Sequence, residues 1–430
     1  MASDSPDAPG FAFSSQARRT QRQPISYLMA QAVENPDVIS LAAGLVDGDT
    51  LPAREAFDLL GPMLCATPSA RAALQYGTTQ GLLPLREKVL AHMAALDGLT
   101  VADLAGTPDD VVITTGSQQL LFILADILLD PGDVVVTGWP SYFVFTGTLE
   151  AAGAHVRCAD MDEQGLVPES LERVLAGLEA EGLLPRVRML YTVSYHQNPT
   201  GITLAEGRRP RIVEIVRRFS AEHRILIVED AAYRELTFEG RPPRSMVCHD
   251  RQRRHVALLQ TFSKTFAPGL KVGYALVPHE LVEPVLLQKG NHDFGSANLC
   301  QHVVLAAMEN GSYARHVDAL RRHYVAKRDA MLDALAEHLD GLPGVRWTHP
   351  SGGLYVFLTL PEGLETHTRG PLFPRALEEG VLYVPGEYCY PPDPTRTTPQ
   401  NAMRLCYGVC TVEQIRAGIA ALARAVRAVM

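Results

Sequence analysis

The sequence predicts an α/β protein in which a large domain, built on a mostly parallel sheet flanked by helices, is joined to a smaller α/β domain. Between residues 111 and 264, apolar β-branched segments alternate with helical segments, the pattern of a parallel sheet covered by helices on both faces. A long charged helix at 313–339 then leads into further strands and a final helix at 412–429. At 430 residues, the chain also exceeds one ordinary domain.

The composition narrows the class of protein. Hydrophobic residues make up 47% and charged residues 20% of the chain, the balance of a soluble globular protein. The net charge is −9 and the basic cluster at 251–255 is short, which argues against a nucleic-acid partner. Apolar runs are too short to span a membrane, and no secretory leader precedes them, so we expect a cytoplasmic protein. The seven scattered cysteines lack metal-ligand spacing, so no metal is expected.

Residues 1–24 are rich in serine, aspartate, proline and arginine and are expected to form a mobile arm. Residues 25–70 follow as the N-terminal part of the small domain, with helical spacing at 25–33 and a short strand at 38–41. The next loop contains Gly44 among several glycines and aspartates, a composition that lets the backbone approach a ligand closely. A plain surface turn is the alternative.

The large domain is predicted at 71–310 and begins with Tyr76, before a glycine turn and an amphipathic helix at 82–96. The strand at 111–114 and the helix at 120–129 are joined by Gly116, Ser117 and Gln118. Small residues between a strand and a helix leave backbone N–H groups and the helix dipole facing an anion. Capping of the helix by Ser117 is the simpler interpretation, and the two are compatible.

The strand at 133–137 ends beside Trp139 and Tyr142. Either ring is suited to stacking on a flat aromatic ligand, and core packing is the plain alternative for both. The alternation continues with strands at 154–158, 187–193, 225–228 and 255–260 and helices at 168–180 and 205–222.

Polar residues follow the later strands of this series. They are Asn198 in an Asn-Pro turn, Asp230 and Tyr233 after one strand, and Ser263, Lys264 and Lys271 after another. The carboxyl ends of parallel strands meet at one edge of the sheet, where ligands bind. A lone lysine is usually solvated, but an amine that forms a Schiff base and a carboxylate that pairs with a pyridinium nitrogen are what a pyridoxal phosphate (PLP) site requires.

Residues 311–430 are predicted to form the C-terminal small domain. Its strand at 401–407 contains Arg404. The planar guanidinium matches a carboxylate in a bidentate manner and so fixes a substrate rather than merely attracting it. A surface salt bridge is the alternative.

Ser263-Lys264 followed by Pro268 to Tyr274 resembles the cofactor-lysine signature of the class I/II aminotransferases, which are fold-type I PLP enzymes. Matching segments run in order from Gly44 to Tyr407, and the sequence is most similar to the aminoadipate, kynurenine and aromatic aminotransferase branch. The resemblance implies a homodimer with composite active sites. It also implies the following roles: Lys264 carries PLP; Asp230 faces the ring nitrogen; Tyr142 stacks on the ring; Asn198 and Tyr233 bind the phenolate oxygen; Gly116, Ser117, Gln118, Ser263, Lys271 and Tyr76 of the neighbouring subunit hold the phosphate; and Gly44, Asn198 and Arg404 bind the substrate carboxylate.

The expected activity is transfer of an amino group between an L-amino acid and a 2-oxo acid by a ping-pong mechanism, in which Lys264 moves the proton of the substrate Cα atom. A PLP enzyme of the same fold that diverts the reaction to elimination, cyclisation or oxidation is one alternative. A regulator that binds PLP or another ligand without turnover is a second, although residues 1–23 are too few to form the DNA-binding domain of such proteins. The family usually has arginine at the position of Lys271, so we expect weaker cofactor retention. The rim residues suit aminoadipate, aromatic or branched-chain substrates.

Overall fold

The structure is a computed structural model that describes residues 11–21, 27, 31, 34–35 and 37–430. Much of the predicted arm at 1–24, and most of the helix expected at 25–33, therefore lies outside the described residues. Within the described part of the chain, no helix combines the length and the apolar character needed to cross a bilayer.

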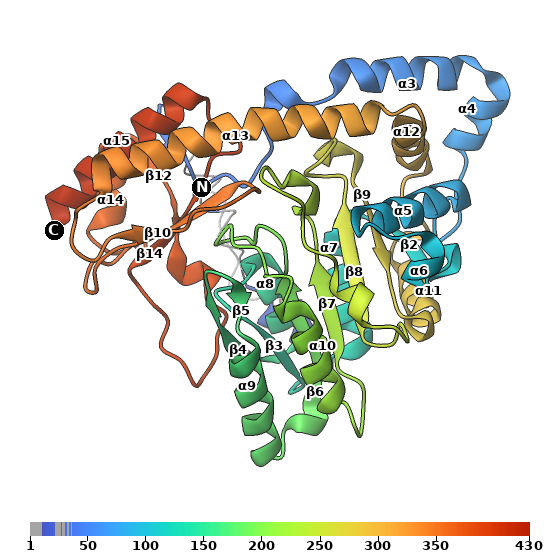
Figure 1. The fold of residues 1–430 in the computed structure, drawn as a ribbon, viewed down its shortest axis with the longest axis horizontal. Helices are drawn as coiled ribbons and strands as arrows, with labels where there is room; N and C mark the ends of the chain where they lie inside the picture. Colours follow the sequence, from blue (N-terminus) through green and yellow to red (C-terminus); the bar gives the residue numbers. More distant parts are fainter. Residues whose placement is uncertain (1–10, 22–26, 28–30, 32–33, 36) are drawn as a thin grey trace.

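An eight-stranded sheet runs through the larger part of the molecule (Figure 1), with the strand order β2-β9-β8-β7-β6-β3-β4-β5. The central strands pair in parallel, whereas β9 is antiparallel to both of its neighbours and β5 is antiparallel to β4. The predicted mostly parallel sheet is thus confirmed. Its strands are β2 (Val111–Thr115), β3 (Val134–Trp139), β4 (His155–Asp162), β5 (Gly165–Leu166), β6 (Val187–Val193), β7 (Leu226–Asp230), β8 (Val256–Thr261) and β9 (Val272–Leu276).

Alternate residues of these strands belong to two separate hydrophobic cores. Val135 packs into one core and Val134 and Val136 into the other, as expected when successive side chains of a strand point to opposite faces. Helices α7, α8 and α11 cover the first face, and α5, α9, α10 and α12 cover the second. The bounds are α5 (Leu83–Leu96), α6 (Val101–Leu104), α7 (Gly116–Leu128), α8 (Phe143–Ala152), α9 (Pro168–Ala180), α10 (Arg208–Arg218), α11 (His279–Asp293) and α12 (Asn298–Glu309).

A smaller sheet forms the other part of the molecule, with the antiparallel strand order β10-β11-β14-β13. Helix α13 (Ser312–Leu339) runs from beside α12 along this part and packs on α15 (Figure 1). The remaining elements are β1 (Ile39–Ser40), α3 (Ala53–Cys65), α4 (Thr67–Leu74), β10 (Arg346–Trp347), β11 (Tyr355–Thr359), α14 (Leu372–Glu378), β12 (Val381–Leu382), β13 (Val384–Pro385), β14 (Ala402–Cys406) and α15 (Val412–Val429).

The segment at 37–74 contacts both parts of the molecule. Strand β1 pairs in parallel with β12, whereas α3 and α4 pack on α12 of the larger part. The domain boundaries at 25–70, 71–310 and 311–430 remain predictions.

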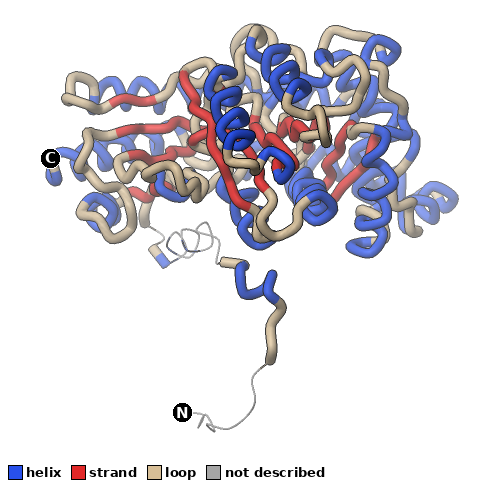
Figure 2. The backbone as a smooth tube through the Cα atoms, turned by 90° about the horizontal axis from the view of Figure 1, so that it is seen from below, coloured by secondary structure: helices blue, strands red, loops and turns tan. Residues whose placement is uncertain are grey.

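Helix α1 (Ser15–Arg19) belongs to the described residues 11–21, and this short section projects from one side of the molecule in Figure 2. Arg19 Nε donates to the carbonyl oxygen of Ala151 in α8 at 3.1 Å. Phe11 and Phe13 are exposed. The arm therefore contacts α8 through an arginine rather than through its aromatic residues.

Candidate active site

A cavity of about 290 Å³ lies at the carboxyl ends of β2, β6, β7 and β8. This is the edge of the sheet where the sequence places the polar residues, because ligands of parallel sheets bind outside the carboxyl ends of the strands. The predicted site residues that line the cavity are Gly116, Ser117, Gln118, Tyr142, Asn198, Asp230, Tyr233, Ser263, Lys264 and Lys271.

Lys264 lies three residues beyond the end of β8, and its Nζ atom donates to the carbonyl oxygen of Gly44 at 3.0 Å. Burial lowers the pKa of this amine below its ordinary value of 10.5; Cys406 opposes the shift, and the positive charges of Arg404 and Lys271 add to it. A lowered pKa increases the neutral fraction of a lysine, which is the form that attacks a carbonyl carbon.

Asp230 is the last residue of β7, and its side chain is 4% exposed. It accepts hydrogen bonds from the backbone N–H of Ala232 and from the hydroxyl of Tyr191, each at 3.1 Å. Burial raises the pKa of Asp230 to about 6, and these two hydrogen bonds limit the shift. Among the described residues, no cationic side chain forms a salt bridge with this carboxylate. A ligand nitrogen that carries a proton would stabilise the charged carboxylate directly.

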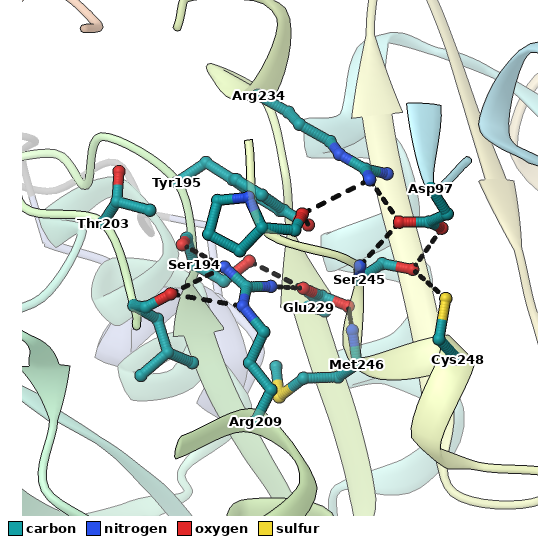
Figure 3. Close-up of polar contacts among 12 residues, drawn as sticks. Asp97, Ser194, Tyr195, Thr203, Arg209, Glu229, Arg234, Ser245, Met246 and Cys248 are labelled. Atoms are coloured by element: carbon teal, nitrogen blue, oxygen red, sulfur yellow. Dashed lines mark hydrogen bonds and ion pairs between the residues drawn. The ribbon is translucent and has the colours of Figure 1, made fainter. Parts of the chain in front are cut away.

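Figure 3 shows two buried ion pairs, formed by Glu229 and by Arg234. These two residues directly precede Asp230 and directly follow Tyr233 in the chain. Glu229 pairs with Arg209 at 2.7 Å and also accepts hydrogen bonds from Ser194 and the backbone of Met246. Arg234 pairs with Asp97, whose carboxylate accepts two hydrogen bonds from Ser245. Breaking a buried pair by removing one partner costs about 3–5 kcal/mol. The segment that presents Asp230 and Tyr233 is therefore anchored at both ends.

The predicted phosphate site lies at the N-terminus of α7. The helix begins at Gly116 rather than at the predicted Leu120, so Ser117 lies inside the first turn and the expected cap by Ser117 is wrong. The first N–H groups of a helix have no intrahelical acceptor and favour an anion. A Cβ atom on Gly273 of β9 would lie 2.5 Å from the backbone carbon of Gly116. Glycine at 273 therefore lets β9 pack directly against this turn.

Lys271 also lines the cavity but is exposed, and its φ is +53°. The backbone of Lys271 is therefore in the left-handed conformation, which costs most residues about 1–2 kcal/mol. Ser263 lies deeper, where its hydroxyl accepts a hydrogen bond from Thr261 at 2.9 Å.

Arg404 lies behind the cavity rather than in its wall, and it is 2% exposed. Nη1 donates to Asn198 Oδ1 at 2.9 Å, and Nη2 donates to the carbonyl oxygen of Ala42 at 2.7 Å. Nε is buried and has no partner among the described residues. The guanidinium is thus fixed in place by Asn198, a residue of the cavity wall, and keeps donors for an anionic group.

Tyr76 and Gly44 do not line the cavity. Tyr76 is 83% exposed, and its ring lies edge-on to that of Phe294, with 5.7 Å between centroids. Asn298 holds the preceding backbone by donating to the carbonyl oxygens of Ala72 and Gln75. Within one chain, Tyr76 is separate from the site that the sequence assigns to it.

Several residues of the site have no role predicted from the sequence. Thr115 and Thr261 line the cavity, Tyr191 binds Asp230, and Tyr355 contacts Tyr233. Tyr191 has a recognisable signal: it lies in β6 two residues before Val193, and Val193 is paired in register with Asp230. Residues two apart on neighbouring strands share a face of the sheet.

Comparison with known proteins identifies the family of this chain. Residues 36–422 match the family described as aminotransferase class I and II. The aromatic-amino-acid aminotransferase 1 of Thermococcus litoralis is 33% identical over 93% of this chain and 90% of its own length. The 2-aminoadipate transaminase of Thermus thermophilus is 32% identical over 97% of both chains. Among solved structures, the kynurenine aminotransferase of Pyrococcus horikoshii, in complex with PMP, superimposes with a TM-score of 0.88 at 32% identity over 97% of both chains.

Proposed function

We propose that this chain, which belongs to the class I and II aminotransferases, prefers L-amino acids with aromatic or other large apolar side chains as its substrates. As a member of this family, it is a PLP-dependent enzyme that transfers amino groups between amino acids and 2-oxo acids. One observation carries this choice. The cationic residues that line the cavity are Lys264 and Lys271, and the cofactor requires both. Among the described residues, no further cation of the cavity wall is left to bind a second carboxylate, whereas Leu45 exposes an apolar side chain there.

The residues of the cavity fit PLP. Asp230 is a buried carboxylate whose pKa is raised to about 6, and a protonated ring nitrogen would provide the positive charge that this position lacks. Lys264 is a lysine with a lowered pKa in the same cavity, and the first turn of α7 with Ser263 and Lys271 supplies donors for a phosphate. When bound, PLP accepts the electrons released at the substrate Cα atom.

With PLP bound, residues of this chain would have the following roles. Arg404, held by Asn198, binds the α-carboxylate of the substrate. Lys264 Nζ removes the proton from the substrate Cα atom, and its lowered pKa favours the neutral amine that this step requires. The Asp230 carboxylate keeps the ring nitrogen protonated, and Asn198 and Tyr233 donate hydrogen bonds to the phenolate oxygen. Tyr142 covers one face of the ring.

We further propose that two copies of the chain form a homodimer in which Tyr76 reaches the phosphate of the partner's site. An exposed apolar surface supports this arrangement. It includes Phe57 and Leu64 of α3, Leu74 of α4, Tyr76 and Phe294. Such a concentration of large exposed apolar side chains is typical of a protein interface.

The test is to load the purified protein with PLP and to follow its visible spectrum after adding one amino acid at a time. L-Phenylalanine, L-tyrosine and L-leucine should convert the spectrum to that of the aminated cofactor, and a 2-oxo acid should restore it. L-2-Aminoadipate tests for a second carboxylate. Conversion of the spectrum by L-2-aminoadipate that is much faster than conversion by L-phenylalanine would refute the proposed substrate class. Released ammonia or a persistent band at long wavelength would indicate diverted chemistry. The Lys264→Ala variant is the control and should not form the covalent PLP complex.

A further inference from the structure

Tyr355 connects the smaller sheet to the active site. It is the first residue of β11 and is 1% exposed. Its hydroxyl oxygen lies 3.0 Å from the hydroxyl oxygen of Tyr233, and the two rings meet edge-on at 81° with 5.7 Å between centroids. One tyrosine from the smaller sheet and one from the loop after β7 thus share a buried hydrogen bond beside the cavity.

The surroundings leave little freedom to the Tyr355 hydroxyl. The Arg404 guanidinium lies over the Tyr355 ring, 4.6 Å from its centroid. A Cβ atom on Gly44 would lie 2.7 Å from the Tyr355 hydroxyl oxygen, which is too close for two atoms that are not bonded. The hydroxyl therefore has room only because residue 44 is glycine.

Both hydroxyls keep their protons at working pH. Burial raises the pKa of Tyr355 to about 12, even though Arg404 acts in the opposite direction. Burial, and then the neighbouring Tyr355, raise the pKa of Tyr233 well above its ordinary value. A phenol has one hydrogen to donate and can accept as well. If Tyr233 donates its hydrogen to the cofactor, its oxygen remains free to accept one from Tyr355.

We propose that Tyr355 is a positioning residue, whose hydroxyl donates to Tyr233 so that the Tyr233 hydrogen points at the phenolate oxygen of PLP. This inference rests on the proposed role of Tyr233. Hydrogen bonds in a chain polarise and strengthen one another by about 10–30%. A stronger donor stabilises the phenolate, and the Lys264 nitrogen joined to the cofactor consequently loses its proton at lower pH.

The experiment is a pH titration of the visible absorption of the PLP-loaded protein. The midpoint of this titration is the pH at which half of the Lys264 nitrogen joined to PLP has lost its proton. Tyr355→Phe removes the donor and should raise this midpoint by about 0.2–0.5 pH unit. Gly44→Ala should displace the same hydroxyl and also raise the midpoint. The double variant should show no further rise, because phenylalanine leaves room for the new methyl group; the two effects are then not additive.

Tyr383→Phe is the matched control, because Tyr383 also loses a buried hydrogen bond, to the carbonyl oxygen of Thr366, in the same part of the fold. Its midpoint should equal that of the wild type. A Tyr355→Phe midpoint that does not rise above this control overturns the inference. A wild-type protein that never develops the visible band contradicts the proposed function instead, so the two failures are distinguishable.

Discussion

Replacing Arg404 by lysine tests the carboxylate site, because the charge stays while the planar fork is lost. In the structure, one edge of the guanidinium is held by Asn198 Oδ1 at 2.9 Å and the carbonyl oxygen of Ala42 at 2.7 Å. An ammonium is a point donor and cannot keep these contacts while forming two parallel bonds to a substrate. Losing one hydrogen bond to a charged group costs about 1.5–3 kcal/mol, so kcat/KM should fall by about 10- to 150-fold.

The assay compares kcat/KM for L-phenylalanine with the rate of cofactor amination by 2-phenylethylamine, which lacks the carboxylate. The amino acid should show the full loss, and the amine should change by less than about threefold. Arg86→Lys is the matched control: Arg86 is also buried, and it binds the carbonyl oxygen of Pro108 and the carboxylate of Asp109 away from the cavity. An equal loss with both substrates would mean general damage and would refute the role of Arg404.

Three further predictions concern other parts of the site. In the PLP-free protein, Asp230 has a pKa of about 6 against an ordinary 3.8; the folded state thus holds a proton that the unfolded state releases, and stability falls as pH rises from about 4 to 6. In urea unfolding, the free energy of unfolding of Asp230→Asn relative to that of the wild type should increase by up to about 3 kcal/mol between pH 4 and 7. A difference that does not depend on pH would contradict this. Lys271→Ala should weaken PLP binding by at least about tenfold and Lys271→Arg should strengthen it, as measured by equilibrium titration; unchanged affinity in Lys271→Ala would exclude the phosphate role. Mixing inactive Tyr76→Ala and Lys264→Ala protomers should restore activity if the dimer shares its sites, since a mixed dimer then contains one complete site, and no recovery in verified mixed dimers would refute sharing.

The sequence predicted the framework of the site because that framework depends on local patterns. The bounds of β6 and α9 agree with the predicted 187–193 and 168–180, and Asp230 and Lys264 are located by the apolar strands that precede them. Once the strands are assigned as parallel, their carboxyl ends must share one edge. Residue type and strand end together therefore predicted most of the cavity lining.

The contacts that the sequence could not predict join segments far apart in the chain. Tyr355 appears in sequence as an ordinary buried strand residue, and its contact with Tyr233 depends on how the smaller sheet packs on the larger one. The start of α7 was also misplaced, because Gln119 accepts the hydrogen bond of the Thr115 N–H and extends the helix to Gly116. Propensity alone favoured a later start at the apolar residues.

Glu229 and Asp230 show how one strand separates structural support from chemistry. They are consecutive and buried, and they point to opposite faces of the sheet. Glu229 is neutralised by Arg209 at 2.7 Å, so its charge is compensated by the protein itself. Burial raises the pKa of both carboxyl groups, but Arg209 opposes the shift at Glu229, whereas among the described residues Asp230 receives hydrogen bonds from only the Tyr191 hydroxyl and the Ala232 N–H. A carboxylate paired with an arginine would have little reason to interact with a ligand nitrogen, whereas one held by neutral donors gains its counter-charge when the ligand binds. Burial of the Asp230 carboxylate thus destabilises the PLP-free protein, and for the same reason it favours a protonated ring nitrogen when PLP is bound.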